Sequence, residues 1–228
     1  MRGAVRAGEV ASASTRLTAD KEECVSKLRY SGSISLDGFA AGPDQSPEHP
    51  LGVGGRALHT WMKDLDAAQS GSSRLLEEDD TGVGALIMGR NMFGGGPGPW
   101  GEDPWQGWWG PNPPFHLPVF VLTHHPRPPL SCEGGTTFTF VTDGLEAARA
   151  QAEEAAGGQH VDICGGATVA KQYLAAGLLD EILLHLVPIF LGAGVRLFDD
   201  QAFATISLAQ VFVVEAPGVT HLKYRVLR

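Results

Sequence analysis

Residues 165–198 read GGATVAKQYLAAGLLDEILLHLVPIFLGAGVRLF, and this stretch decides the fold. An apolar run at Val161–Cys164, typical of a buried strand, ends at the Gly165–Gly166 turn. A helical pattern follows over Ala167–Ala176, and Gly177 is a favourable residue for closing that helix. Backbone N–H groups at such a strand-to-helix turn point towards whatever lies beyond the end of the strand. The stretch therefore predicts a site for an anion or a phosphate.

The rest of the chain alternates between strand and helix patterns. Leu28–Ala41 alternates in polarity and predicts a first strand that ends in a turn at Asp37–Gly38. Further strands are predicted at 85–88, 119–123, 138–141, 182–187, 206–214 and 220–227, and further helices at 58–69 and 145–156. Parallel strand–helix–strand units followed by antiparallel strands make an α/β fold. We therefore expect a mixed, mostly parallel sheet that is flanked by helices and has antiparallel C-terminal strands.

Length, composition and charge restrict the class of protein. The chain has 228 residues, of which 43% are hydrophobic and 19% charged, as in ordinary globular proteins. We expect a single domain over residues 28–228, and a disordered extension over residues 1–27, which are rich in Ala, Ser and Arg and show little periodicity. A net charge of −9 argues against a nucleic-acid partner, because nucleic acids bind basic surfaces. No apolar window reaches the roughly 18–20 residues of a membrane span. Three widely separated cysteines favour a reducing cytoplasm.

Residues 94–118 form the most biased segment, with seven Gly, seven Pro and four of the five Trp. Such a segment cannot hold regular structure, so it is predicted to leave the core as a long excursion. Tryptophans are costly to leave in water. Two interpretations remain open: a packed flap or dimer contact, and a pocket for a flat substrate that is bordered by one or more of Trp100, Trp105, Trp108 and Trp109.

Two more strand ends carry groups that can bind phosphate. Met88-Gly89-Arg90-Asn91 repeats the strand-to-helix pattern, and an arginine there can pair with a phosphate through two hydrogen bonds. Leu122–Arg127 reads LTHHPR and supplies a hydroxyl, two imidazoles and a guanidinium. A G-x-G-x-x-G fingerprint and an acidic residue at the ribose-binding position are both missing, which disfavours a Rossmann dehydrogenase. The three strand ends together indicate a nucleotide cofactor.

These pieces resemble the dihydrofolate reductase-like superfamily, and most closely the branch of the C-terminal reductase domain of the riboflavin biosynthesis deaminase-reductase. The resemblance spans about residues 30–227 and rests on SLDGFAA (35–41), LIMGRNMF (86–93), VLT (121–123), GGA (165–167), GLLDE (177–181) and PIFLGAGVRLF (188–198), which occur in the family order. It implies a dihydrofolate reductase-like fold and an NADPH-dependent reductase. Related domains commonly pair, so it also implies a homodimer, which the tryptophan-rich excursion could join.

The resemblance also implies where the cofactor would lie, which is across the C-terminal ends of the parallel strands. Its phosphates and adenosine end would contact Gly89, Arg90, Asn91, Thr123, His124 and Arg127. Gly165, Gly166, Ala167, Thr168 and Val169 would hold the pyrophosphate and the nicotinamide ribose, and Ser33 and Ala40 would meet the carboxamide. The positive charge near the adenosine end favours NADPH over NADH, because only NADPH carries a 2′-phosphate.

The substrate is less defined. The carboxylate that protonates the pterin in dihydrofolate reductases has two possible counterparts, Asp64 and Asp66, either of which could equally be an ordinary surface acid. Trp61, Trp100 and Trp105 are candidates for lining the substrate pocket. We therefore expect hydride transfer to a small planar heterocycle, such as a pteridine or pyrimidine, or to a conjugated C=N or C=O group, with Asp64, Asp66 or water supplying the proton.

Other candidate residues favour structural roles, and a second function stays open. His124–His125 lacks the companion ligands of a metal site, so no metal is expected. Cys164 is predicted to be packing, Asp180–Glu181 a structural or surface pair, and the histidines at 49, 59, 116, 160, 185 and 221 have no partner that the sequence identifies. The alternative to a reductase is a non-catalytic module of the same fold that binds a nucleotide without turnover.

Overall fold

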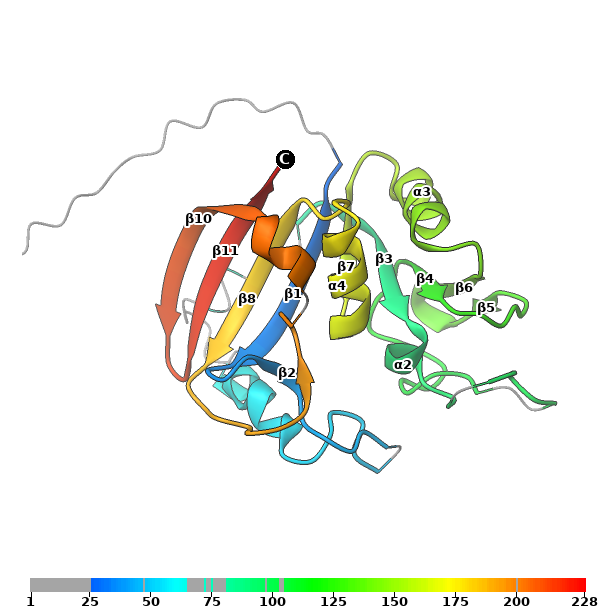
Figure 1. Cartoon of the computed structure of the whole chain (residues 1–228). Helices are drawn as coiled ribbons and strands as arrows, with labels where there is room; N and C mark the ends of the chain where they lie inside the picture. Colours follow the sequence, from blue (N-terminus) through cyan, green and yellow to red (C-terminus); the bar gives the residue numbers. More distant parts are fainter. Residues whose placement is uncertain are drawn as a thin grey trace, which may run out of the picture.

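The computed structural model describes residues 26–46, 48–64, 72, 75, 81–96, 98–102, 105–199 and 201–228. Its centre is a nine-stranded sheet in the order β10-β11-β8-β1-β7-β3-β4-β6-β5 (Figure 1). The parallel strands are β1 (Leu28–Ser35), β3 (Val83–Gly89), β4 (Pro118–Leu122), β6 (Thr137–Val141), β7 (His160–Cys164) and β8 (Glu181–Val187). The antiparallel strands are β5 (Leu130–Ser131), β10 (Ser207–Ala216) and β11 (Val219–Leu227).

One face of this sheet is covered by two helices, α3 (Leu145–Ala156) and α4 (Ala167–Ala175). Their buried side chains form one apolar cluster with Leu28, Tyr30 and Ile34 of β1 and with the inward-facing residues of the neighbouring strands. Alternation along β1 places its apolar residues on this face and Arg29, Ser31, Ser33 and Ser35 on the other.

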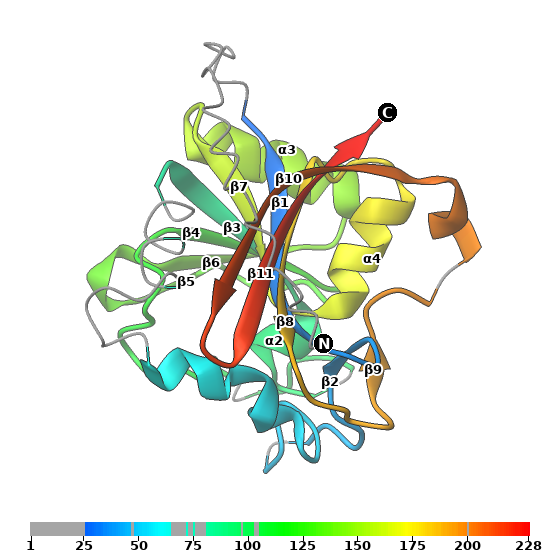
Figure 2. The same ribbon diagram turned by 90° about the vertical axis from the view of Figure 1, so that its left-hand side faces the viewer.

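The second face carries two separate apolar clusters. Over β8 and β11, Leu58 and Trp61 of the 3-10 helix η1 (Gly55–Asp64) pack against Val187 and Val219. Over β3, β4 and β6, the core residues are Met88, Phe93, Val119, Val121 and Phe138, with Trp100, Trp109 and Phe115 of the excursion packed against them. Since β1 and β7 lie between these strand groups, the polar side chains of β1 form a strip between the two clusters. Figure 2 shows η1 at the lower end of the molecule, below the β10–β11 hairpin.

The predicted fold class is confirmed, and its details differ from the prediction in two places. The run 28–41 is divided by the Asp37–Gly38 turn into β1 and the short β2 (Phe39–Ala41), which pairs with β9 (Val195–Arg196). The helix predicted at 58–69 is a 3-10 helix that begins earlier, at Gly55, and residues 65–69 lie outside the described part. The remaining short elements are α2 (Arg90–Phe93), η2 (Glu133–Gly135) and η3 (Gln201–Thr205).

The Gly- and Pro-rich excursion has no helix or strand among its described residues between Gly94 and Leu117, as predicted. The helix α4 ends at Ala175, and Gly177 follows with a φ of 67°, a conformation that glycine adopts without strain.

A carboxylate joins two of the motifs that carry the family resemblance. Asp37, in the turn after β1, accepts hydrogen bonds from Ser35 Oγ at 2.6 Å, Leu191 N at 3.1 Å and Gly192 N at 2.7 Å. These hydrogen bonds, led by that of Ser35, lower the pKa of Asp37 to about 2. Asp37 therefore holds the 35–41 turn against the 188–198 loop as a charged group.

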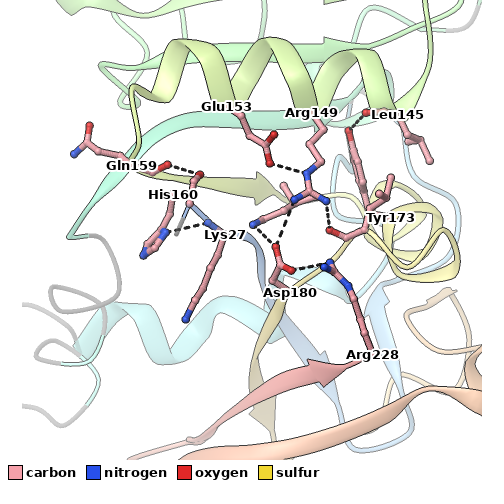
Figure 3. A network of polar contacts seen from close by, with 12 residues as sticks. Lys27, Leu145, Arg149, Glu153, Gln159, His160, Tyr173, Asp180 and Arg228 are labelled. Atoms are coloured by element: carbon pink, nitrogen blue, oxygen red, sulfur yellow. Dashed lines mark hydrogen bonds and ion pairs between the residues drawn. The ribbon is translucent and has the colours of Figure 1, made fainter. Parts of the chain in front are cut away.

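A second carboxylate joins elements at the amino-terminal edge of the sheet (Figure 3). Asp180 Oδ2 accepts a hydrogen bond from Leu28 N at 2.9 Å, and Oδ1 lies 2.7 Å from Arg228 Nη2. Arg149 of α3 approaches Asp180 at 3.8 Å and also donates to Glu153 at 2.7 Å. These contacts tie β1, α3 and the C-terminus together, which supports the structural interpretation of Asp180.

Candidate functional site

Three neighbouring strands end side by side at the carboxyl edge of the sheet. The register pairs Gly89 at the end of β3 with Leu122 at the end of β4, and Ile87 of β3 with Ile163 of β7. The turns that follow these strands begin at Arg90, Thr123 and Gly165 and therefore meet at one edge. In Figure 1 the arrowheads of β1, β8 and β3 point downwards to this edge, and α2 lies just below β3. The structure thus brings together the three strand ends that the sequence selects.

The glycines at this edge allow close backbone approach. A Cβ atom on Gly89 would lie 2.7 Å from Cγ2 of Val169, so β3 and α4 meet here without room for a side chain. Gly165 has a φ of 64°, and a Cβ there would lie 2.9 Å from Sδ of Met92. Gly166, with a φ of 76°, is exposed, has open space around its Cα and precedes α4, which has no side-chain cap. The start of α4 is therefore open to an anion.

Arg90 is the first residue of α2, and its side chain packs against residues of the excursion. Its Nε donates to Gly94 O at 3.1 Å and its Nη2 to Gly95 O at 3.3 Å. Its guanidinium carbon lies 3.1 Å from the centroid of a Trp100 ring, in a cation–π contact. Nη1 is buried and has no hydrogen-bond partner among the described residues. A buried guanidinium nitrogen without an acceptor is costly, so this atom is suited to donate a hydrogen bond to an anionic oxygen.

Arg127 contacts the same indole. Its guanidinium carbon lies 4.6 Å from the Trp100 ring centroid, and Nη1 donates to Trp105 O at 2.7 Å. The Trp100 indole N–H donates to His125 O at 2.8 Å. Partial burial lowers the pKa of both arginines, and the charge of Arg127 lowers that of Arg90 further. Two cations are therefore held close together beside an aromatic ring, an arrangement that a phosphate would stabilise.

Several other predicted cofactor residues lie at the same edge. Thr123 is buried, and its Oγ1 accepts a hydrogen bond from His125 N at 3.2 Å, while His124 is exposed. Asn91 and Thr168 are exposed, and Ala167 is buried against the main core. Ser33 is buried in β1 and Ala40 lies in β2, on the side of β7 away from β3.

The predicted substrate residues are spread over two places. Trp61 is buried over β8, and its indole N–H donates to Leu58 O at 3.0 Å and approaches Ser33 Oγ at 3.3 Å. Trp100 belongs to the cluster on the far side of β1 and β7. Trp105 lies at the surface, where its ring meets Trp108 edge-on at 4.7 Å. The structure therefore places Trp61 and Trp100 on either side of the polar strip of β1.

The two candidate acids lie at the limit of the description. Asp64 ends η1, but its side chain lies outside the described part, and so does the whole of Asp66. Cys164, at the end of β7, is partly buried, and burial together with the Asp162 carboxylate raises its pKa to about 11. The thiol stays protonated near neutral pH, which supports its interpretation as packing.

Sequence reasoning missed a pair of buried histidines. His185 of β8 and His221 of β11 are register partners, and their Nδ1 atoms lie 2.7 Å apart. A signal was available in β1, whose odd-numbered residues Arg29, Ser31, Ser33 and Ser35 give a central strand one polar face. Polar residues on a buried strand need partners on the adjacent strands.

Comparisons with known proteins place the fold in a family. The RibD C-terminal domain matches residues 26–221. The chain belongs to this family. No curated protein gives a significant match.

Solved structures of RibD-related proteins share the fold. A protein assigned to riboflavin biosynthesis from Shewanella sp. PV-4 has 24% identity and a TM-score of 0.58, covering 89% of this chain and 99% of that one. Acinetobacter baumannii RibD has 16% identity and a TM-score of 0.55, covering 90% of this chain and 59% of that one, so this chain spans only part of RibD. A pyrimidine reductase-like protein from Corynebacterium diphtheriae has 16% identity and a TM-score of 0.52, covering 89% and 92%. A RibD C-terminal domain has a reductase-type fold. The solved structures share this fold with 89–90% of the present chain.

The described residues also bear on two other classes of site. Among them no helix is long and apolar enough to cross a membrane. The same part of the chain holds no group of three or more His, Cys, Asp or Glu side chains arranged to bind a metal ion.

Proposed function

We propose that this RibD C-terminal domain protein is an NADPH-dependent reductase that acts on a small planar heterocycle, such as a pyrimidine or pteridine, or on a related conjugated substrate. The observation that carries the proposal is the meeting of three strand ends at one edge, where Arg90 and Arg127 converge and Arg90 Nη1 is buried without a partner among the described residues. A dinucleotide with several phosphates is the ligand that such an edge fits.

The residues present suit NADPH. The open start of α4 at Gly166 would hold the pyrophosphate, since backbone N–H groups and the helix dipole favour anions there. Arg90, Arg127 and the exposed His124 after β4 would bind the 2′-phosphate. When bound, NADPH supplies a hydride to the carbon of a C=N or C=O bond, whose nitrogen or oxygen then takes up one proton.

We place the substrate over the polar strip of β1, between the cluster that contains Trp61 and the cluster that Trp100 contacts. The strip offers the half-buried hydroxyl group of Ser31, and the flanking indoles suit a flat ring. The proposed substrate position is next to the proposed pyrophosphate site, because Ser31 pairs in register with Cys164, the residue before Gly165.

We also propose that two copies of the chain pair through β10. This strand forms one edge of the sheet, and Leu208, Val211 and Val213 on it are 39–48% exposed. Exposed apolar side chains on an edge strand favour pairing with another chain. Light scattering should give twice the mass of the chain, and Val213→Lys should shift that mass towards the monomer. A monomeric wild-type protein at micromolar concentration would contradict this part of the proposal.

The decisive experiment on function has two stages. Titration calorimetry should show NADPH binding, with weaker binding of NADH, and the absorbance at 340 nm should then report NADPH oxidation with a panel of aminopyrimidines, pteridines and conjugated imines and ketones. Oxidation with one member of the panel supports a reductase. Binding without oxidation across the panel would favour a non-catalytic nucleotide-binding module, and absence of binding would refute both.

A further inference from the structure

Four side chains form a hydrogen-bonded chain across three strands on the polar face of the sheet. Ser31 Oγ of β1 lies 3.0 Å from Nε2 of His185, and Nδ1 of His185 lies 2.7 Å from Nδ1 of His221. Nε2 of His221 then lies 2.8 Å from Oγ of Ser72. Each contact is within hydrogen-bond distance, so the chain is continuous from Ser31 to Ser72.

The hydrogen bonds from Ser31 to Ser72 have a direction, because each runs from a donor to an acceptor. When two Nδ1 atoms face each other, one of them must donate and the other accept, and a neutral imidazole has one donor and one acceptor nitrogen. Burial lowers the pKa of His221, which favours the neutral form of that ring. When both rings are neutral, all the hydrogen bonds of the chain point in the same sense. If every bond reverses together, one proton leaves at one end and one enters at the other.

Within the described structure, the Ser31 end of the hydrogen-bonded chain is the more exposed one. His221 is fully buried, and His185 and Ser72 are at most 5% exposed. Ser31 is half-buried and stands level with Cys164, directly before the Gly165–Gly166 turn. The Trp61 ring packs against both imidazoles, with ring centroids 4.9 and 5.3 Å away. The Ser31 end thus faces the edge at which we place the cofactor and the substrate.

We propose that the His185–His221 pair supplies the proton of the reduction, and that the Ser31 hydroxyl delivers it to the substrate. This inference rests on the proposed reductase function. Ser31 gives its proton to the reduced nitrogen or oxygen and takes one from Nε2 of His185. His185 takes a proton at Nδ1 from His221, and His221 takes one at Nε2 from Ser72, which is reprotonated by water. After the product leaves, the shift runs backwards with water at Ser31 as the proton source, and the starting arrangement returns.

The pair shares its strand face with ion pairs. On the strand face that it shares, Arg29 is paired with Asp162 at 2.7 Å, and Lys223 with Glu181 at 3.1 Å, both towards the amino-terminal edge of the parallel strands. The charged and titratable groups on the elements that pack around the pair include Arg29, Asp162, Glu181, Glu215, Lys223, Tyr224, Arg225, Arg56, His59 and Lys63, besides Asp64 at the end of η1.

The test uses single turnovers of the NADPH-loaded full-length protein with the panel compound that the wild type reduces fastest. The wild-type rate should be nearly independent of pH between about 6 and 8, because neutral groups pass the proton on. In His185→Gln, the amide can still donate to Ser31 but cannot relay a proton. Its rate should be about 100-fold lower than that of the wild type at pH 7. It should then drop tenfold for each unit by which the pH rises, because the proton must come from solution. The NADPH dissociation constant should change less than about twofold.

Three further variants complete the test. Ser31→Ala should show the same loss without disturbing the buried pair, and Ser31→Thr, which keeps the hydroxyl, should restore most of the rate. His160→Gln is the matched control, because His160 is a half-buried histidine that bonds to Lys27 N at the other edge of the sheet. Its pH profile should equal that of the wild type.

The outcomes separate the two proposals. Wild-type turnover together with unchanged rates and pH profiles in both His185→Gln and Ser31→Ala would overturn the relay and leave the reductase standing. Loss of the pH-independent rate in Asp64→Asn or Asp66→Asn, and not in the relay variants, would assign the proton to an acid instead. A wild type that binds or oxidises no NADPH would overturn the reductase and, with it, the relay.

Discussion

The guanidinium carbon of Arg90 lies 3.1 Å from the ring centroid of Trp100. Arg127 contacts the same ring, so one indole shares two cations that stand at the ends of neighbouring strands. Because both arginines are the proposed partners of the 2′-phosphate, NADPH binding should alter the environment of this indole. We expect NADPH to quench the tryptophan fluorescence, and Trp100→Phe to remove most of that quench. Trp108→Phe, which changes a surface ring, is the control, and an equal quench in both variants would place the cofactor elsewhere.

Arg90 should set the preference for NADPH over NADH. Removing a charged hydrogen bond to phosphate costs about 1.5–3 kcal/mol, so Arg90→Ala should weaken NADPH binding by about 10- to 100-fold. NADH binding should change much less, because it has no 2′-phosphate. Titration calorimetry with both dinucleotides measures the difference. Arg228→Ala, which removes an exposed arginine at the opposite edge, should leave both affinities unchanged, and unaltered NADPH binding in Arg90→Ala would refute our placement of the phosphate.

Gly89→Ala should destabilise the domain through a steric clash. Its Cβ would lie 2.7 Å from Cγ2 of Val169, and forcing a methyl group into a packed contact costs about 1–3 kcal/mol. Val169→Ala removes the clashing atom, so the double variant should be more stable than the sum of the two single changes predicts. Urea unfolding of the four proteins gives the coupling. Simple additivity would show that β3 and α4 separate to accept the methyl group.

The Asp37 carboxylate should make stability depend on pH at the acid end. Its pKa is about 2 in the folded protein against an ordinary value of 3.8, so its ionised form stabilises the fold above pH 3.8. This contribution is lost as the pH falls through about 2. Asp37→Asn should therefore be less stable than the wild type at pH 7, with a difference that shrinks between about pH 4 and pH 2. Thermal melting at several pH values measures it, and a constant difference would contradict the assignment.

The strand ends were predictable because their signals are local. A short apolar run, a glycine turn and the start of a helix occupy a dozen residues, so Gly89 and Gly165 could be placed on strand ends directly from the sequence. The order of the strands then brought these ends to one edge, as parallel connections usually do. The resemblance contributed the roles of individual residues, such as Ser33 and Ala40, which no local pattern indicates.

The histidine pair was not predictable in the same way. His185 and His221 are 36 residues apart, and their contact depends on the antiparallel register of β8 and β11. A one-residue shift of either strand would turn its ring to the opposite face of the sheet and separate the pair. The packing of the excursion was one of two predicted possibilities, but the contacts of Trp100 were not predictable: glycines with positive φ precede it at 94, 95, 96 and 98, and such backbone conformations are not specified by side-chain patterns.

The place of β1 in the sheet has a consequence for how this protein folds as it is made. Among the described strands β1 comes first in the sequence, yet its neighbours in the sheet are β7 and β8, whose contacting residues follow 133 and 152 residues later. Tyr30 and Ile34 therefore have no partner strand until most of the chain has been synthesised. Pairings across such sequence distances form slowly and leave apolar segments exposed meanwhile. The nascent chain should accordingly depend on chaperones until β8 emerges, and its central sheet should close in a single late step.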